Sequence, residues 1–126
     1  MPAAQAFTKR FTDKYGSPPD NQAWGDYVGV RIVLQCMAET KSTEATKLVE
    51  YLEKGASFDL LKDRKGSFRK WDHQLLQEMY IVKVKEKAKS KDKWDIFDLV
   101  RSVPGPKESL ELIQPTLTEN PCKLIA

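Results

Sequence analysis

The sequence predicts an α/β fold in which three helices pack on a small mixed sheet and an extended C-terminal tail follows. Two observations predict it. Apolar residues recur every three or four positions up to Gly55, as in amphipathic helices, and after Gly55 they follow the shorter spacing of strands. The chain of 126 residues is 40% hydrophobic and 10% aromatic, which is enough apolar material for one domain with its own core.

The first helix is predicted over residues 3–15. Phe7, Phe11 and Tyr15 recur every four residues and therefore form one apolar stripe, with charged residues on the other side. Gly16 can adopt the left-handed conformation that ends a helix, and the two prolines that follow cannot continue it.

A second helix is predicted from Asp20 or Asn21, because either side chain can cap a first turn. Its expected apolar face comprises Ala23, Tyr27, Val30, Leu34 and Met37. Val28, Ile32 and Val33 widen that face, which predicts burial on more than one side. At about 18 residues the helix would span about 27 Å and form the spine of the fold.

Shorter elements follow. Residues 41–43 offer a cap to a third helix, which Gly55 ends. Residues 57–61 and 67–69 predict two strands joined by an exposed turn.

The last third of the chain predicts two more strands, over residues 78–84 and 94–100. The strand over residues 78–84 has apolar residues on both faces at its start. This predicts that other elements pack against both faces of the strand at that point. Beyond them, residues 108–113 predict a helical turn, and the tail from Gln114 is expected to be extended.

The charge balance argues against nucleic acid as a partner. The 21 basic and 18 acidic residues give a formal charge of +3, which is too balanced to imply nucleic-acid binding. Residues 83–93 contain six lysines, but no aromatic residue is interleaved with them before Trp94. We therefore predict a solvated loop rather than a nucleic-acid site.

Few residues are suited to catalysis. His73 is the single histidine, and its neighbour Asp72 would point to the opposite face of a strand, so we expect a structural histidine at the edge of a turn. Two carboxylate pairs occur by spacing, namely Asp95 with Asp98 and Glu108 with Glu111. Their polar surroundings favour surface salt bridges over acid/base chemistry. The sequence contains no nucleophile motif, phosphate loop or metal-ligand spacing, and thus predicts neither an enzyme nor a cofactor.

Five segments carry a resemblance to a known family. They are residues 7–19, 22–27, 66–74, 79–85 and 119–122. In this order they resemble the C-terminal region of type I periplasmic solute-binding proteins, the leucine/isoleucine/valine-binding family of ABC importers, especially members that bind branched-chain amino acids, amides or urea. Proteins of that family are much longer. The resemblance therefore implies that residues 1–126 are a C-terminal fragment and form part of one lobe of that fold.

The resemblance also implies a ligand-binding segment. Two lobes of such proteins close on a small polar solute, and the segment leading into the long helix lies at the wall of the cleft. Here it holds Asn21, Gln22 and Trp24. Gln22 would form hydrogen bonds with the solute and Trp24 would provide a flat apolar wall. The alternative is that Asn21 is a helix cap and Trp24 is core. The better-known amino acid binders have an aromatic residue near Gln22, so the solute stays open.

The implied function is that of the substrate-binding component of an ABC importer, non-catalytic, with a permease as partner of the full-length protein. Two alternatives are a small module that binds acidic partners through the lysine loop and a sensory module built on the same fold. Because a fragment leaves strand edges and apolar helix faces uncovered, we also expect the isolated chain to self-associate.

The implied location is the periplasm. Residues 1–5 lack the basic and then apolar pattern of a secretion signal, so the chain as written would stay in the cytoplasm. The two statements agree if a preceding segment carries the signal.

The two cysteines, Cys36 and Cys122, are too far apart for a local metal or redox motif. In an exported protein they can form a disulfide. By constraining the unfolded chain, this bond would raise the free energy of unfolding by about 4–5 kcal/mol at most. Two reduced thiols, one on a helix and one in the tail, are the other expectation.

Overall fold

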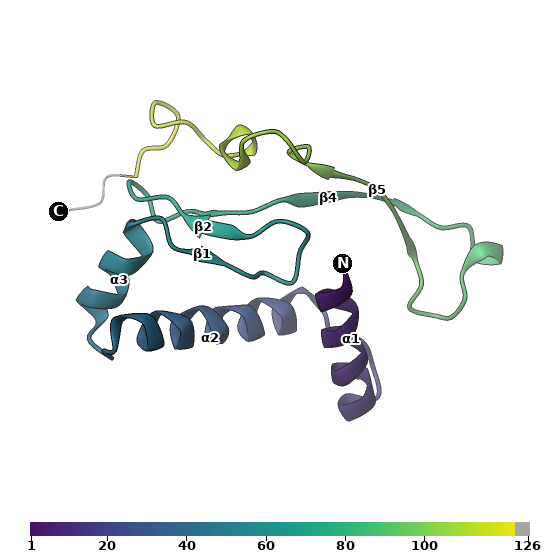
Figure 1. Cartoon of the computed structure of the whole chain (residues 1–126). Coiled ribbons are helices and arrows are strands. Elements are labelled where there is room, and N and C mark those ends of the chain that lie inside the picture. The colour runs from purple at the N-terminus through teal and green to yellow at the C-terminus, as the bar shows by residue number, and fades with distance from the viewer. Residues whose placement is uncertain (123–126) are drawn as a thin grey trace.

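The computed structural model describes residues 1–122, and it has three helices followed by short strands (Figure 1). The helices are α1 (Pro2–Tyr15), α2 (Asn21–Thr40) and α3 (Ala45–Glu53). The strands are β1 (Ser57–Phe58), β2 (Gly66–Phe68), β3 (Leu75–Leu76), β4 (Met79–Val84) and β5 (Phe97–Val103). Two 3-10 turns, η1 (Lys87–Lys89) and η2 (Leu110–Ile113), complete it. The predicted α/β class and the three helices are confirmed.

Local signals fix the ends of the helices. Gly16 has a φ of 75° and donates its N–H to Thr12 O at 2.8 Å, which closes α1. Asp20 caps α2, since its Oδ1 accepts the N–H of Ala23 at 2.8 Å. Of the two cap candidates, Asp20 is therefore the cap and Asn21 is the first helical residue.

The buried face of α2 differs from the predicted one. Val28, Ile32 and Cys36 are buried, each four residues after the last. Val30 and Leu34, which we expected at the centre of the apolar face, are 60% and 58% exposed. The helix is apolar on two sides, and spacing alone does not tell which side meets the sheet.

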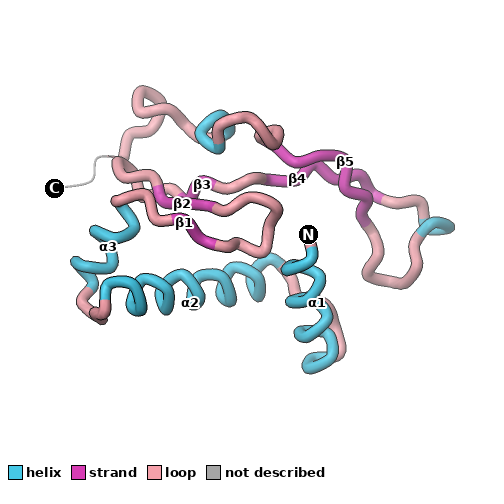
Figure 2. The backbone as a smooth tube through the Cα atoms, in the orientation of Figure 1, coloured by secondary structure: helices cyan, strands magenta, loops and turns pink. Residues whose placement is uncertain are grey.

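The strands form two antiparallel sheets rather than one mixed sheet. The first has the order β1-β2-β3, and it lies along α2 (Figure 2). The predicted strand over residues 57–61 ends at Phe58, because Asp59 turns the chain: its Oδ1 accepts the N–H of Leu61 at 2.8 Å, and Leu61 has a φ of 62°. Strand β3 was not predicted, since two residues carry no periodicity.

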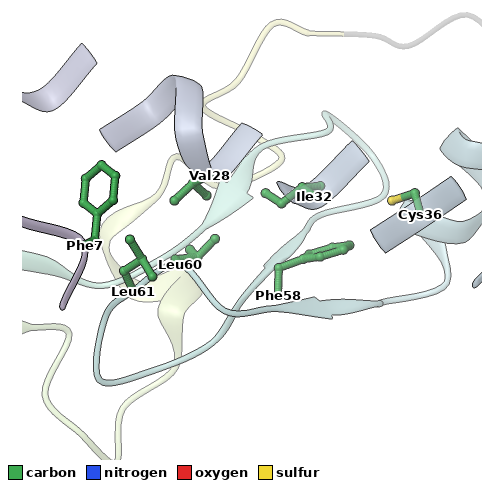
Figure 3. Close-up of a cluster of buried hydrophobic side chains, with 7 residues drawn as sticks. All are labelled: Phe7, Val28, Ile32, Cys36, Phe58, Leu60 and Leu61. Atoms are coloured by element: carbon green, nitrogen blue, oxygen red, sulfur yellow. The ribbon is translucent and has the colours of Figure 1, made fainter. Parts of the chain in front are cut away.

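The core lies between α2 and the first sheet (Figure 3). Seven buried apolar residues form it: Phe7, Val28, Ile32, Cys36, Phe58, Leu60 and Leu61. Phe7 joins α1 to this cluster and stacks on Tyr27 with ring centres 4.6 Å apart. The three helices are thus tied to one small core.

The second sheet is a ribbon of β4 and β5 that extends away from the helices (Figure 1). We expected β4 to be covered on both sides at its start, and this is wrong: Met79 is 50% exposed and Ile81 is 40% exposed. Within residues 1–122, β4 and β5 are the only strands of this sheet. The lysine-rich segment between its strands is exposed, as predicted for a solvated loop.

The tail returns over the first sheet. The predicted helical turn near residues 108–113 is η2, and beyond it the described chain has no further helix or strand up to Cys122. Within residues 1–122, no helix is both long enough and apolar enough to cross a bilayer.

Candidate functional site

The start of α2 is the place where the sequence predicted ligand contacts. Asn21 and Gln22 are exposed there, in the first turn of the helix. The Asp20 carboxylate already caps this turn. Asn21 is therefore not the cap, and both amide side chains are open to solvent.

Trp24 has a different environment from Gln22. Its ring is partly buried and packs against the core. Its indole Nε1 donates a hydrogen bond to Leu60 O at 2.9 Å. Residues two apart on a helix do not face each other, so Trp24 fastens α2 to the loop after β1 while Gln22 points elsewhere. The structure does not bring Gln22 and Trp24 together into one site.

A polar cluster that sequence analysis missed lies beside Trp24. Lys62 Nζ donates to Glu78 O at 2.6 Å, and it lies 5.0 Å from the centre of the Trp24 ring and 5.2 Å from that of Tyr80. Glu78 is only 2% exposed, and its Oε1 accepts the N–H of Arg64 at 2.9 Å and the Tyr80 hydroxyl at 3.1 Å. These contacts join α2, the 59–65 loop and the start of β4.

Burial shifts the pKa values of Lys62 and Tyr80 in this cluster. Desolvation lowers the pKa of Lys62, against the opposing effect of the Glu78 charge. Desolvation also raises the pKa of Tyr80, and the neighbouring Glu78 acts in the same direction. The Lys62 ammonium is thus the cation of two cation–π contacts, one with the ring of Trp24 and one with the ring of Tyr80. The residues of this cluster are distant from one another in the sequence. No local sequence pattern indicates contacts between such residues, so sequence analysis could not find the cluster.

A second network holds the tail. The Arg69 guanidinium pairs with both oxygens of Asp72, and its Nη1 donates to Glu111 Oε2 at 2.6 Å. Asn120 Nδ2 donates to Asp72 Oδ2 at 2.9 Å. Arg69 also stacks on Trp71, with its Cζ 3.9 Å from the ring centre. The side chains of Arg69 and Asp72 are 5% and 4% exposed, so this network closes the tail over the turn between β2 and β3.

Stability is expected to fall in acid through Asp72. The hydrogen bonds from Arg69 lower the pKa of this carboxyl to about 2, below the value of about 3.9 for an unfolded chain. A carboxyl group whose pKa is lowered by folding stabilises the folded state at every pH above its unfolded-state pKa. This contribution is lost as the pH falls from about 4 to about 2. Denaturant unfolding at a series of pH values measures it. Asp72→Asn should have a shallower slope in this window, and equal slopes in both proteins would contradict the assignment.

His73 does not contact Asp72, in agreement with the sequence-based argument. Its Nε2 lies 2.9 Å from Glu53 Oε1, and its backbone φ is 55°, at a turn. Asp72 is directed to Arg69 instead.

Of the four carboxylates in the two predicted pairs, three form ion pairs, as expected, whereas Glu108 accepts a backbone N–H instead. Asp95 binds Lys85 Nζ at 2.6 Å, and Asp98 binds the same atom at 3.4 Å. Glu108 accepts the N–H of Gly105 at 2.6 Å, while Glu111 binds Arg69.

Cys36 and Cys122 are both free in the structure. Cys36 is 1% exposed in the core, and burial raises the pKa of its thiol. Cys122 is exposed in the tail. Among the described residues, no group of three or more His, Cys, Asp or Glu side chains is arranged to hold a metal ion.

An open hollow between α1 and α2 is another concave surface. Its lining is aromatic and basic: Phe7, Arg10, Phe11, Lys14, Tyr15, Ala23 and Tyr27. Arg10 Nη2 donates to the Tyr27 hydroxyl at 3.2 Å. Neither Gln22 nor Trp24 lines this hollow.

Comparisons with known proteins identify the family. The model of the family described as periplasmic binding protein matches residues 1–91. A periplasmic binding protein from Burkholderia mallei is 28% identical, with a TM-score of 0.72, over 82% of this chain and 27% of its own. A branched chain amino acid ABC transporter periplasmic ligand-binding protein from Burkholderia xenovorans LB400 is 32% identical, with a TM-score of 0.74, over 82% of this chain and 27% of its own.

An amino acid ABC transporter substrate-binding protein from Pseudomonas fluorescens Pf-5 is 27% identical, with a TM-score of 0.67, over 78% of this chain and 26% of its own. No curated protein matches the chain. The chain thus spans about a quarter of the length of these solved structures. Since the family model matches well over half of the residues, the chain belongs to the periplasmic binding protein family.

Proposed function

We propose that the chain is the C-terminal part of a non-catalytic, periplasmic substrate-binding protein that delivers a branched-chain amino acid, an amide or a similar small polar solute to an ABC permease. The observation that carries this proposal is the likeness to the Burkholderia xenovorans protein, at 32% identity and a TM-score of 0.74. That protein is described as a branched chain amino acid ligand-binding protein. The Pseudomonas fluorescens relative, described as an amino acid substrate-binding protein, supports the same class of solute.

The proposal that the chain is a part of a larger protein is supported by the outer face of α2. Val30, Val33 and Leu34 are 60%, 45% and 58% exposed on the side opposite the core. An apolar stripe on each side of a helix is typical of a helix packed between two layers. In a complete two-lobed protein, further elements would cover this second stripe.

Within such a protein, Gln22 is the residue that we propose contacts the solute. It is exposed at the start of α2, and its carboxamide can both donate and accept hydrogen bonds to a carboxylate, amide or ammonium group. Asn21 is proposed as its neighbour on the same wall. Trp24 has its N–H bound to Leu60 O, so we propose that it positions the wall from behind.

The test replaces the matching quarter of the Burkholderia xenovorans protein with this chain and titrates the chimera with leucine, isoleucine, valine and small amides by calorimetry. Loss of a hydrogen bond to a charged solute group costs about 1.5–3 kcal/mol. Gln22→Ala should therefore weaken binding by at least about tenfold. Gln5→Ala, another exposed glutamine, is the matched control and should bind normally. Unchanged affinity in Gln22→Ala would reject the role of Gln22, and binding of no solute by a folded chimera would reject the proposed function.

A further inference from the structure

The described chain ends in a segment that folds on itself (Figure 1). Residues 105–122, which we call the strap, pair with no strand of either sheet. Within residues 1–122, the backbone-to-backbone hydrogen bonds of the strap all close inside it. Examples run from Glu108 N–H to Gly105 O at 2.9 Å and from Asn120 N–H to Thr116 O at 3.0 Å. The local fold of the strap therefore does not depend on the backbone of residues 1–104, which we call the body.

The strap adds no side chain to the hydrophobic core. Pro104, directly before it, is fully buried, but no residue of the strap is buried. The core and the partly buried side chains packed against it all come from residues 4–75. Leu112 and Leu117 of the strap are 67% and 69% exposed. Hydrophobic burial, the dominant favourable term in folding, thus contributes little to holding the strap in place.

Arg64 of the body binds the first turn of the strap. Its Nη1 donates to Gly105 O at 3.2 Å and its Nη2 donates to Glu108 O at 2.9 Å. The Glu108 carboxylate in turn accepts the Gly105 N–H at 2.6 Å, which keeps this turn closed. One guanidinium group therefore holds two carbonyl groups of the strap, and hydrogen bonds from a charged donor are about twice as strong as neutral ones.

The Arg69–Asp72 pair of the body binds the later part of the strap. The two side chains are 5% and 4% exposed, and each is the partner of the other. The strap adds one contact to each member: Arg69 Nη1 donates to Glu111 Oε2 at 2.6 Å, and Asn120 Nδ2 donates to Asp72 Oδ2 at 2.9 Å. Since the pair is formed within the body, it stays paired when the strap leaves.

These contacts allow the strap to detach without unfolding of the body. Segments with few buried apolar contacts open locally, at a lower free energy than global unfolding. The Glu111 carboxylate is 48% exposed, so dissolved salt screens its attraction to Arg69.

We propose that the strap is a releasable part of the fold: it detaches from the body and rebinds as one unit while the helices and the first sheet stay folded. Arg64 and the Arg69–Asp72 pair are its binding site. High ionic strength favours the detached strap, and detachment exposes the guanidinium N–H groups that the strap otherwise occupies. The strap thereby controls access to the two arginines. The proposal does not depend on solute binding by Gln22.

The test is hydrogen exchange of the 126-residue chain, followed by mass spectrometry on peptides from the strap and from α2. Strap amides should exchange faster than α2 amides, because local detachment releases them, whereas α2 exchanges only when the core unfolds. They should exchange more slowly than the same amides in a synthetic peptide of residues 105–122. Strap exchange should speed up more than α2 exchange as the ionic strength rises from about 0.01 M to about 1 M, where the Debye length falls from about 30 Å to about 3 Å.

A double variant removes the contacts of the strap with both arginines. Arg64→Gln with Glu111→Ala should speed strap exchange by at least about tenfold, because a hydrogen bond to a charged group is worth about that factor or more. The exchange of α2 and the circular dichroism spectrum should stay as in the parent chain. Glu111→Ala alone should remove most of the salt dependence of strap exchange, since it removes the exposed carboxylate.

The matched control is Arg101→Gln with Glu50→Ala, which exchanges the same residue types at exposed positions outside the strap. It should leave strap exchange unchanged. Strap and α2 amides that exchange at one common rate in the parent would make the strap part of the cooperative core and overturn the proposal. Strap exchange as fast as in the synthetic peptide would show that the body does not hold it. Equal effects of the double variant and the control would show that the two arginines are not its binding site.

Discussion

Replacement of Phe58 by alanine is expected to lower the free energy of unfolding by about 3–5 kcal/mol. Phe58 is 1% exposed at the centre of a core of only seven buried apolar side chains, and its ring packs edge-on against Phe68 with centres 6.1 Å apart. Since domains are stable by only about 5–15 kcal/mol, this single change removes a large part of the total.

Denaturant unfolding followed by circular dichroism measures the effect of Phe58→Ala. Leu112→Ala is the control, because Leu112 is 67% exposed and exposed substitutions change stability by only about 0.5 kcal/mol. A loss below about 1 kcal/mol for Phe58→Ala would show that the core described between α2 and the first sheet is not the one that holds the fold.

The second large effect is expected for Gly66→Ala. A Cβ atom at Gly66 would lie 2.4 Å from Leu60 Cδ1 and 2.7 Å from the backbone oxygen of Leu76. Leu60 is fully buried and the Leu76 oxygen belongs to strand β3, so neither neighbour can move freely. Overpacking of this kind costs about 1–3 kcal/mol, and we expect the upper end of that range.

Gly29→Ala is the matched control for Gly66→Ala, since a Cβ atom at Gly29 meets nothing within 4 Å. In the interior of α2 this change should stabilise the chain by about 0.5–1 kcal/mol. The same unfolding experiment measures both variants. A Gly66→Ala protein as stable as the parent would contradict the close approach of β2 to Leu60.

The sequence predicted those features that depend on local signals. Gly16 and Asp20 determine where α1 ends and where α2 begins, and both act within one helical turn. The spacing of apolar residues alone could not show which side of α2 faces the core, because Val30 and Leu34 form an apolar stripe as regular as that of Val28 and Ile32. The choice between them depends on where the sheet lies, and the sheet comes later in the chain.

Local spacing could likewise not predict which contacts the candidate site residues make. The exposure of Gln22 agrees with a residue at a cleft wall, although the solute contact itself stays a prediction. Trp24 bonds to Leu60, 36 residues away, and Lys62 contacts Glu78, 16 residues away. Contacts at such separations arise from folding of the whole chain and leave no trace in local spacing.

Two arginines of the first sheet region hold the end of the chain. Arg64 donates to the carbonyl oxygens of Gly105 and Glu108, 41 and 44 residues later, and Arg69 reaches Glu111, 42 residues later. During synthesis from the N-terminus, the arginines and the sheet that carries them leave the ribosome well before the tail. Capture of the tail is thus a late event in the maturation of the chain, and a nascent polypeptide halted before Gly105 would present both guanidinium groups without these acceptors.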